Sequence, residues 1–278
     1  MTSLSDALRT TGTVDLSAFD SRATTGFDGD KADAKEATPA LDTELADLQE
    51  RLFANGATDA TNRKVLLLLQ GMDTSGKGGT ISHVVGAMNP QGLSITSFKR
   101  PSPEELEHDF LWRIEQALPE PGMVGVFDRS QYEDVLIGRV RQLAPAEEIE
   151  RRYDAINAFE RDFVDDGGVV VKCFLHITAD DQKERLAARL EDPTKYWKYN
   201  EGDLEERALW DQYQDAYAVA LDRCSTDHAP WHLVPSGRKW YRNWAVATLL
   251  LEALQGLDLD WPGPDFDLEA ERKRVAAA

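Results

Sequence analysis

The sequence has little cysteine and no long hydrophobic run. Its 278 residues include 2 cysteines, Cys173 and Cys224, which is too few for a disulfide framework. The longest unbroken aliphatic stretch, 65–69, is far shorter than the roughly 20 residues that span a bilayer. The N-terminus lacks the basic and apolar segments of a secretory signal. We therefore expect a cytoplasmic protein with no membrane partner.

Basic residues are also scarce, since 31 Lys and Arg stand against 50 Asp and Glu, for a net charge of −19. Proteins that bind nucleic acid in general need a basic surface, so we expect no nucleic-acid partner. Two further signatures are missing: the closely spaced cysteine pair of a structural zinc site, and the G-x-S-x-G nucleophile turn. An anionic substrate, if there is one, must be held by a local group of cations.

What the sequence does contain is an alternation of short apolar runs and helical stretches, which predicts a parallel sheet covered by helices. The expected strands are 64–69, 93–97, 123–127, 169–177 and 232–234. The expected helices are 41–53, 79–88, 103–118, 146–164, 179–190, 204–224 and 239–254. We assign residues 1–40 to a flexible acidic arm, 41–257 to one domain, and 258–278 to an extended tail.

The strongest motif follows the first expected strand. Residues 71–79 read G-M-D-T-S-G-K-G-G, which matches the phosphate loop G-x-x-x-x-G-K in its strand–loop–helix context. Inward-pointing amides, a helix N-terminus and the Lys77 charge would together bind phosphate oxygens. A glycine-rich turn of another α/β fold would explain the glycines but not Lys77. We expect phosphate to contact Gly71, Thr74, Ser75, Gly76, Gly78, Gly79 and Thr80, with Lys77 catalytic.

Gly78 stands where such loops usually carry the Ser or Thr that ligates Mg²⁺, so a metal must find other oxygens. Asp73 lies inside the loop, and Asp128 ends the strand 123–127 at the sheet edge where ligands bind. We expect both to be catalytic metal ligands, although Asp128 is also suited to capping a helix. We expect Arg129 to be catalytic as well, by neutralising phosphate charge; the alternative for it is a salt bridge with a nearby acid.

Other cations are grouped along the chain. Lys99 and Arg100 follow the second strand, and Arg113 lies on the next expected helix. The segment 191–199, with a proline and three aromatics, is typical of a mobile cover, or else of an ordinary connection whose aromatics pack on the body. The cations that we expect to hold phosphate around it are Arg185, Arg189, Lys195 and Lys198. Residues 223–244 carry four basic residues against one acid.

Several motifs in order resemble the second family of polyphosphate kinases. They are Gly71-x-Asp73-x-x-Gly76-Lys77-Gly78-Gly79, Phe98-Lys99-Arg100-Pro101, H-D-F-L-W-R at 108–113, D-R-S-Q-Y-E-D-V-L at 128–136 and R-K-W-Y-R-N at 238–243. The resemblance runs from about residue 41 to 262. It implies a P-loop kinase fold, a three-layer α/β/α sandwich with a five-stranded parallel sheet and a helical lid at about 185–207. In that family the essential acids fall at Asp73 and Asp128.

The resemblance also implies an activity: reversible transfer of phosphoryl groups between inorganic polyphosphate and nucleotides, with Mg²⁺, or Mn²⁺ as an alternative. The form of residues 132–136 is similar to the class III branch, which phosphorylates AMP to ADP and ADP to ATP. The chain departs from that branch at Asp128 and Gln131, where members often have Asn and His.

As further partners we expect adenine nucleotides and guanine nucleotides. We also expect the chain to form a homo-oligomer, either a dimer or a tetramer. The expected nucleotide-binding residues are Arg113, Tyr132, Glu133 and Asp134, although the two acids are equally suited to the first turn of a helix. Two alternatives stay open: an ATP-dependent nucleotide or nucleoside kinase of the same fold, and a non-catalytic nucleotide-binding regulator.

Overall fold

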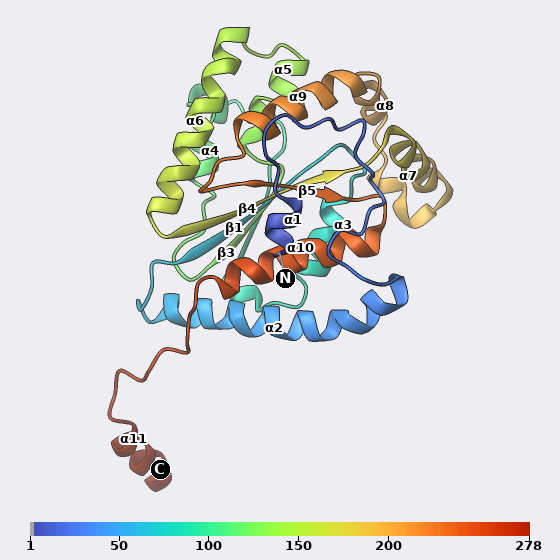
Figure 1. Ribbon diagram of the computed structural model, residues 1–278. Coiled ribbons are helices and arrows are strands. Elements are labelled where there is room, and N and C mark those ends of the chain that lie inside the picture. Colours follow the sequence, from blue (N-terminus) through green and yellow to red (C-terminus); the bar gives the residue numbers. More distant parts are fainter. Residues whose placement is uncertain (1–2) are drawn as a thin grey trace.

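A five-stranded parallel sheet forms the centre of the computed structural model, which describes residues 3–278 (Figure 1). The strands are β1 Lys64–Gln70, β2 Leu93–Ser97, β3 Val124–Asp128, β4 Gly168–His176 and β5 Trp231–Pro235, in the spatial order β2-β3-β1-β4-β5. The register pairs Leu69 of β1 with Asp128 of β3 and Cys173 of β4. All five predicted strands are confirmed to within one residue at each end.

Helices cover both faces of the sheet, and the side-chain alternation of β1 shows why. Val65, Leu67 and Leu69 pack with one group of helices, whereas Leu68 points into the opposite layer. The first layer contains α2 Lys31–Ala57, α3 Lys77–Val84 and α10 Lys239–Gln255, and the second contains α6 Ala146–Asp165 and α9 Trp210–Arg223 (Figure 1). The three-layer α/β/α prediction is therefore confirmed.

The shorter elements lie at the edges and between these layers. They are α1 Leu4–Leu8, η1 Pro90–Gly92, η2 Glu105–Glu107, α4 Trp112–Glu115, η3 Gln131–Asp134, α5 Ile137–Val140, α7 Ala179–Glu191, η4 Pro193–Lys198, α8 Gly202–Arg207 and α11 Leu268–Ala277. In residues 3–278 no helix is long and apolar enough to pass through a bilayer.

Four helix predictions were wrong in extent, and one of them, 79–88, is α3, which ends at Val84. The expected helix 103–118 is two short pieces, because the Asp109 carboxylate accepts the Leu111 N–H at 3.0 Å in a local turn that competes with helical bonding. The expected helix 204–224 is divided into α8 and α9. Helix α2 begins ten residues earlier than expected, because Asp30 and Asp33 form a reciprocal capping box at its start.

The N-terminal segment is not the loose arm that its composition indicated. Leu4, Leu8 and Leu16 are buried, and the first two N–H groups of α1 donate to the Glu252 carboxylate at 2.7 and 2.8 Å. Arg9 then forms an antiparallel bridge with His232 on β5. A few widely spaced leucines and one carboxylate thus hold a segment whose overall composition is polar. At the other end, residues 258–278 leave the body as an extended tail that ends in α11 (Figure 1).

Two buried histidines should make stability fall in mild acid. Burial lowers the pKa of His176 and of His232 to about 4. The unfolded chain takes up their protons below pH 6.5 and the folded chain does not, so stability is lost as the pH falls. From about pH 7.5 to about pH 5 each histidine should cost about 2 kcal/mol. In urea unfolding at several pH values, His176→Phe should remove its share, whereas His108→Gln, at an exposed histidine, should not. An unchanged pH profile for His176→Phe would contradict this.

Candidate active site

The phosphate loop joins the buried end of β1 to the start of α3. Gly71 and Gly76 have φ of +152° and +110°, and Thr74 has φ of +67°, so the chain curls back on itself here. Glycine is favoured at position 76 because its φ of +110° would strain any other residue, and a Cβ there would also lie 1.7 Å from Nη1 of Arg242. The hydroxyls of Ser75 and Thr80 are buried without a hydrogen-bond partner in residues 3–278. The loop therefore has polar groups that lack partners, as expected for a ligand cradle.

Lys77 lies inside this cradle. Its side chain is buried, and its Nζ donates to the Gly71 carbonyl at 2.7 Å. Burial and the nearby Arg129 lower the pKa of Lys77, while the carboxylates of Asp73 and Asp128 act in the opposite direction. The structure therefore brings these four predicted residues into one electrostatic cluster at the carboxyl edge of the sheet.

Arg129 connects the two strand ends. Its backbone has φ of +66°, and its N–H donates to the Leu69 carbonyl at 3.1 Å. The guanidinium lies 3.0 Å from the Asp73 carboxylate and 3.6 Å from that of Glu133. Although burial alone would lower the pKa of Arg129, these two carboxylates outweigh it and raise the pKa. Arg129 therefore forms the salt bridge that the sequence offered as its alternative role. Its partner Asp73 is one of the two expected metal ligands.

The base of the expected lid is attached to the loop. Arg185 on α7 donates to the carbonyls of Thr74 at 2.9 Å and Ser236 at 2.6 Å, so its guanidinium braces the loop. Gln182, one turn earlier, donates to the Asp73 carbonyl at 3.1 Å. Sequence reasoning treated Arg185 as a phosphate ligand and missed Gln182, because a glutamine on a helix carries no distinctive signal.

The other lid cations are mostly paired. Arg189 contacts Asp203 at 3.1 Å, and Lys195 contacts Asp192 at 2.6 Å. Lys198 lies over the exposed ring of Trp197. The carboxyl of Asp203 has a raised pKa because of burial and the charge of Asp73, which brings α8 into the field of the phosphate loop. Tyr196 and Trp197 are 53% and 78% exposed, so these two rings do not pack into the body.

Of the four expected nucleotide ligands, the structure brings only Glu133 into the cluster. Tyr132 is fully buried, and its hydroxyl donates to Glu160 at 2.8 Å, so it faces the interior and its assignment was wrong. Arg113 is buried and donates to the Lys99 carbonyl at 2.8 Å. Asp134, the last residue of η3, pairs with Arg152 of α6 at 3.1 Å. Lys99 and Arg100 are exposed at the end of β2.

Arg242 is a residue that the predictions left out. It is 3% exposed, and its Nη1 donates to the Ser75 carbonyl at 3.1 Å. Burial, with a contribution from Arg185, lowers the pKa of Arg242 to about 10. Lys239, one turn earlier on α10, has a lowered pKa through burial and the charges of Arg185 and Arg242. The basic composition of 223–244 was the signal that pointed here.

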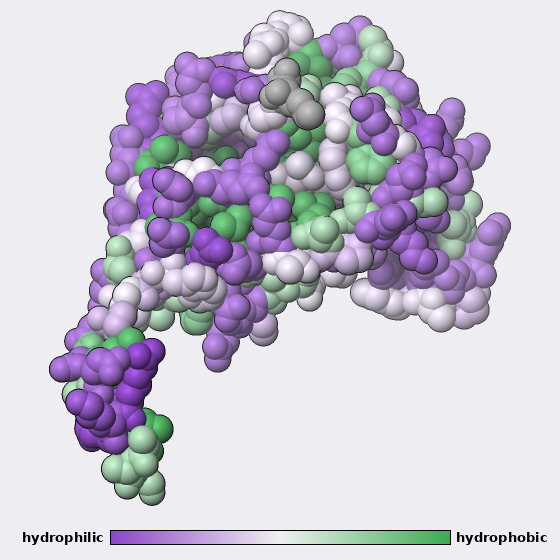
Figure 2. Space-filling model, turned by 60° about the horizontal axis from the view of Figure 1, so that its bottom comes forward, coloured by the Kyte–Doolittle hydropathy of each residue, from purple (hydrophilic) through white to green (hydrophobic). Residues whose placement is uncertain are grey.

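A groove extends from the phosphate loop between α2 and α10. Its volume is 1170 Å³, and it begins at Gly79. Five Lys and Arg side chains line it against Asp30 and Asp42: Lys31, Lys35, Arg238, Lys239 and Arg242. Figure 2 turns the α2 side forward and shows apolar patches between hydrophilic side chains on this face. In an acidic chain, this local excess of cations favours an extended anion.

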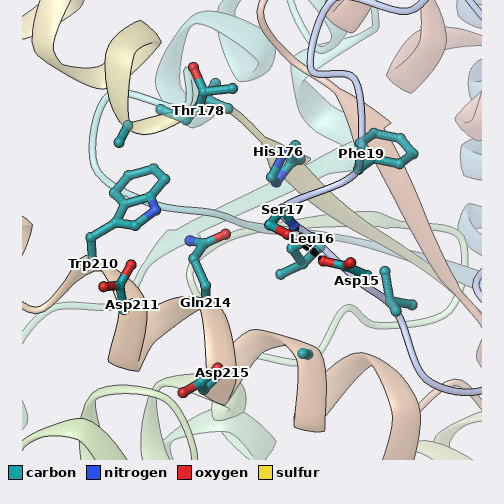
Figure 3. A pocket seen from close by; sticks show the side chains of 14 residues that line it. Asp15, Leu16, Ser17, Phe19, His176, Thr178, Trp210, Asp211, Gln214 and Asp215 are labelled. Carbon is teal, nitrogen blue, oxygen red and sulfur yellow. Dashed lines mark hydrogen bonds between the residues drawn. The ribbon is translucent and has the colours of Figure 1, made fainter.

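A second cavity, of 450 Å³, has the opposite character (Figure 3). It lies between the N-terminal segment, the end of β4 and α9, with His176 and Thr178 on one side and Trp210 and Gln214 on the other. Its acids are Asp15, Asp211 and Asp215, and no Lys or Arg lines it. Like charges repel, so this cavity is unsuited to phosphate.

The model of the Polyphosphate kinase 2 family matches residues 28–260, which include the whole sheet, the loop and the lid. The chain belongs to this family. It is therefore a kinase, and the resemblance on which the fold prediction depended is confirmed.

Relatives agree with this along nearly the whole chain. An AMP/ADP-polyphosphate phosphotransferase of Meiothermus ruber is 45% identical over 254 residues, 91% of this chain and 93% of the relative. An ADP-polyphosphate phosphotransferase of Rhodopseudomonas palustris is 40% identical over 78% of each chain. The crystal structure of polyphosphate kinase 2 from Arthrobacter aurescens TC1 is 55% identical, covers 100% of this chain and 98% of that one, and superposes with a TM-score of 0.97.

Proposed function

We propose that this polyphosphate kinase 2 transfers phosphoryl groups from inorganic polyphosphate to AMP and ADP, in a reversible, metal-dependent reaction. One observation carries the proposal: the groove lined by five cations opens directly from the phosphate loop. That loop carries Asp73 and Lys77, and Asp128 lies beside it. A long polyanion gains one charge-assisted contact with each further phosphate, whereas a nucleotide fills only one end of such a groove. The names of the relatives support the two acceptors.

The proposed metal is Mg²⁺, or Mn²⁺ in its place. In residues 3–278 no group of three His, Cys, Asp or Glu could cage a metal ion. Mg²⁺ is commonly held by one or two carboxylates together with substrate phosphates, so the pair Asp73 and Asp128 fits it. The metal, when bound, would neutralise charge on the transferring phosphate. Because Asp73 now contacts Arg129 at 3.0 Å, we expect this ion pair to be shared or exchanged during binding.

The protein's own groups then supply positioning and charge. Phosphoryl transfer needs little covalent assistance, and catalysis consists mainly of alignment and electrostatic stabilisation. Lys77 and the loop amides hold the phosphate that is transferred, and Arg129 is placed to contact the same oxygens. Arg185 and Arg242 fix the loop carbonyls so that the amides keep pointing inward. We assign no substrate contact to Tyr132, Arg113 or Asp134.

We further propose that residues 41–257 act as one catalytic unit with a lid at about 185–207. The lid would close over the donor chain through Arg189, Lys195 and Lys198, which would exchange their present carboxylate or ring contacts for phosphate. Guanine nucleotides are proposed as additional acceptors, because the charges of the described cluster are directed at phosphate groups, which adenine and guanine nucleotides share.

The test is an incubation of the protein with polyphosphate, Mg²⁺ and AMP or ADP, with the nucleotide products separated by chromatography. ADP from AMP and ATP from ADP are expected, and both should disappear when the metal is chelated. A protein that phosphorylates an acceptor only when ATP is the donor would instead be the ATP-dependent kinase of the alternative reading.

Lys239 provides a sharper test of the groove. It forms no ion pair within residues 3–278, so Lys239→Ala removes an uncompensated cation. We expect a roughly 10-fold higher KM for long polyphosphate, with the KM for AMP unchanged, because one charge-assisted contact is lost. Lys183→Ala, at an exposed lysine on α7, serves as the matched control. Equal losses for polyphosphate and AMP would place Lys239 outside the donor site.

A further inference from the structure

The acidic cavity of Figure 3 lies at the two points where the proposed lid joins the body. Thr178 and Ala179 line it where α7 begins, and Trp210 lines it where α9 begins. The lid, at about 185–207, lies between these points in the sequence, so both of its attachments form walls of the cavity. The volume of 450 Å³ is within the roughly 300–1,000 Å³ that is usual for small-ligand sites.

Two buried polar atoms of the cavity wall have no hydrogen-bond partner within residues 3–278. They are Nδ1 of His176, a residue that is 3% exposed, and Nε2 of Gln214. Figure 3 shows both side chains facing the cavity, and the edge of the Phe19 ring packs on the imidazole with 5.4 Å between the ring centroids. Buried polar atoms normally have a partner, so these two indicate that a further molecule binds here.

Three carboxylates at the mouth of the cavity lack a positive partner. Asp211 and Asp215 are one turn apart on α9, and Asp15 lies on the N-terminal segment. In the part of the chain that the structure describes, none of the three forms an ion pair, and no Lys or Arg lines the cavity. Like charges four residues apart destabilise a helix, and a bound cation removes that repulsion. The charge of the cavity therefore favours a cation.

The arrangement of the lining residues favours an organic cation over a metal ion. Within residues 3–278 no three His, Cys, Asp or Glu side chains are grouped so that they could hold a metal ion. Mg²⁺ and Ca²⁺ need about six oxygen ligands around one point, whereas an ammonium group needs a few acceptors and also binds to the face of an aromatic ring. Trp210 supplies such a ring, and Leu16 and Ala218 supply apolar surface for an alkyl stem.

We propose that this cavity binds a small organic ammonium ion, whose N–H groups donate to the carboxylates at its mouth and to Nδ1 of His176. The alkyl stem of the ligand packs on Trp210. Burial lowers the pKa of His176 to about 4, so the ring is neutral near pH 7 and has an acceptor nitrogen. The Gln214 amide presents its nitrogen to the ligand or, after a half-turn, its oxygen.

An occupied cavity should restrain the lid, a consequence that rests on the proposed function. Arg207, the last residue of α8, donates to the Ala179 carbonyl at 2.6 Å, so the two ends of the lid are already joined beside the cavity. A ligand held between the start of α7 and the start of α9 adds a second connection. Because a lid must open to release products, the bound cation should lower kcat.

The effect on the lid is tested by the initial rate of AMP phosphorylation with and without 1,4-diaminobutane. The amine should lower kcat of the parent and leave that of Asp211→Asn with Asp215→Asn unchanged. Since the amine also binds polyphosphate, and does so equally with both proteins, the difference between them isolates the cavity. Equal inhibition of the two proteins would overturn the effect on the lid, whereas a protein without AMP phosphorylation would contradict the proposed function instead.

The site itself is tested without any substrate, by titration calorimetry with 1,4-diaminobutane and with benzylammonium. At about 0.15 M salt, where distant surface charges are screened, we expect one molecule bound per chain, and no binding of the neutral butane-1,4-diol. Asp211→Asn with Asp215→Asn should weaken the affinity about 10-fold through the loss of two ion pairs. Asp162→Asn with Asp165→Asn, at exposed acids near the far end of α6, removes the same charge and should leave it unchanged. Absence of binding for both amines, or equal weakening by the two double variants, would overturn the proposal.

Discussion

Asp128→Asn should reduce kcat for polyphosphate-driven phosphorylation about 10³-fold, because removal of one preorganised electrostatic group from such a site typically costs this much. The substitution keeps the size and shape of the side chain and removes only its charge. Asp128 ends β3 beside Leu69, within the field of Lys77, so an amide there weakens the proposed metal site without disturbing the sheet. The measurement is initial rate against metal concentration at saturating polyphosphate and AMP.

Two observations make the Asp128 result interpretable. The unfolding midpoint of Asp128→Asn should stay close to that of the parent, since the residue makes no side-chain hydrogen bond within residues 3–278. Asp162→Asn, on the exposed face of α6, controls for the loss of one surface charge. A kcat within a few-fold of the parent at all metal concentrations would remove Asp128 from the metal site and leave Asp73 alone.

Lys172→Met should destabilise the protein by about 3–5 kcal/mol, which is the usual cost of leaving one member of a buried ion pair without its counter-charge. Lys172 on β4 is fully buried, and its Nζ lies 2.5 Å from the Glu160 carboxylate. The same Nζ donates to the Tyr132 hydroxyl at 2.8 Å and to the Cys224 carbonyl at 2.7 Å. Urea unfolding followed by circular dichroism measures the loss.

The double variant Lys172→Met with Glu160→Leu separates the ion pair from packing. Replacing both charges with apolar groups of similar volume is often neutral, so the double variant should be more stable than Lys172→Met alone. The network also holds η3, since Gln131 donates to Glu160 at 3.1 Å. Glu133 of the active-site cluster lies in the same turn, two residues after Gln131. If Lys172→Met lowers the free energy of unfolding by less than about 1 kcal/mol, the Glu160 carboxylate must be solvated by water or move to another partner.

The sheet and the phosphate loop could be predicted because their signals are local. Each strand is a short apolar run followed by a polar turn, and the loop is a contiguous motif directly after β1. The N-terminal segment could not be predicted in this way. Its anchors, Glu252 and His232, are more than 200 residues away in sequence and look like ordinary surface residues.

The roles of the individual cations were harder to predict, since charge type does not reveal a partner. Arg185 and Arg242 look like phosphate ligands, yet both donate to carbonyls of the loop itself. Tyr132 lies in the same motif as Asp128, but the turn of η3 directs its ring inward to Glu160. Such distinctions depend on contacts between residues more than 25 positions apart, which no local pattern encodes.

The antiparallel bridge between Arg9 and His232 has a consequence for how the chain folds. Ribosomes make residue 9 before its partner strand, which emerges only after more than 220 further residues, so the segment around Arg9 waits as an unpaired chain. Closing so long a loop carries a large entropic cost, and contacts of this range form late. Once in place, the segment covers part of the otherwise open edge of β5 and reduces its capacity for strand addition. A segment that is synthesised more than 220 residues before its partner strand thus joins the fold late.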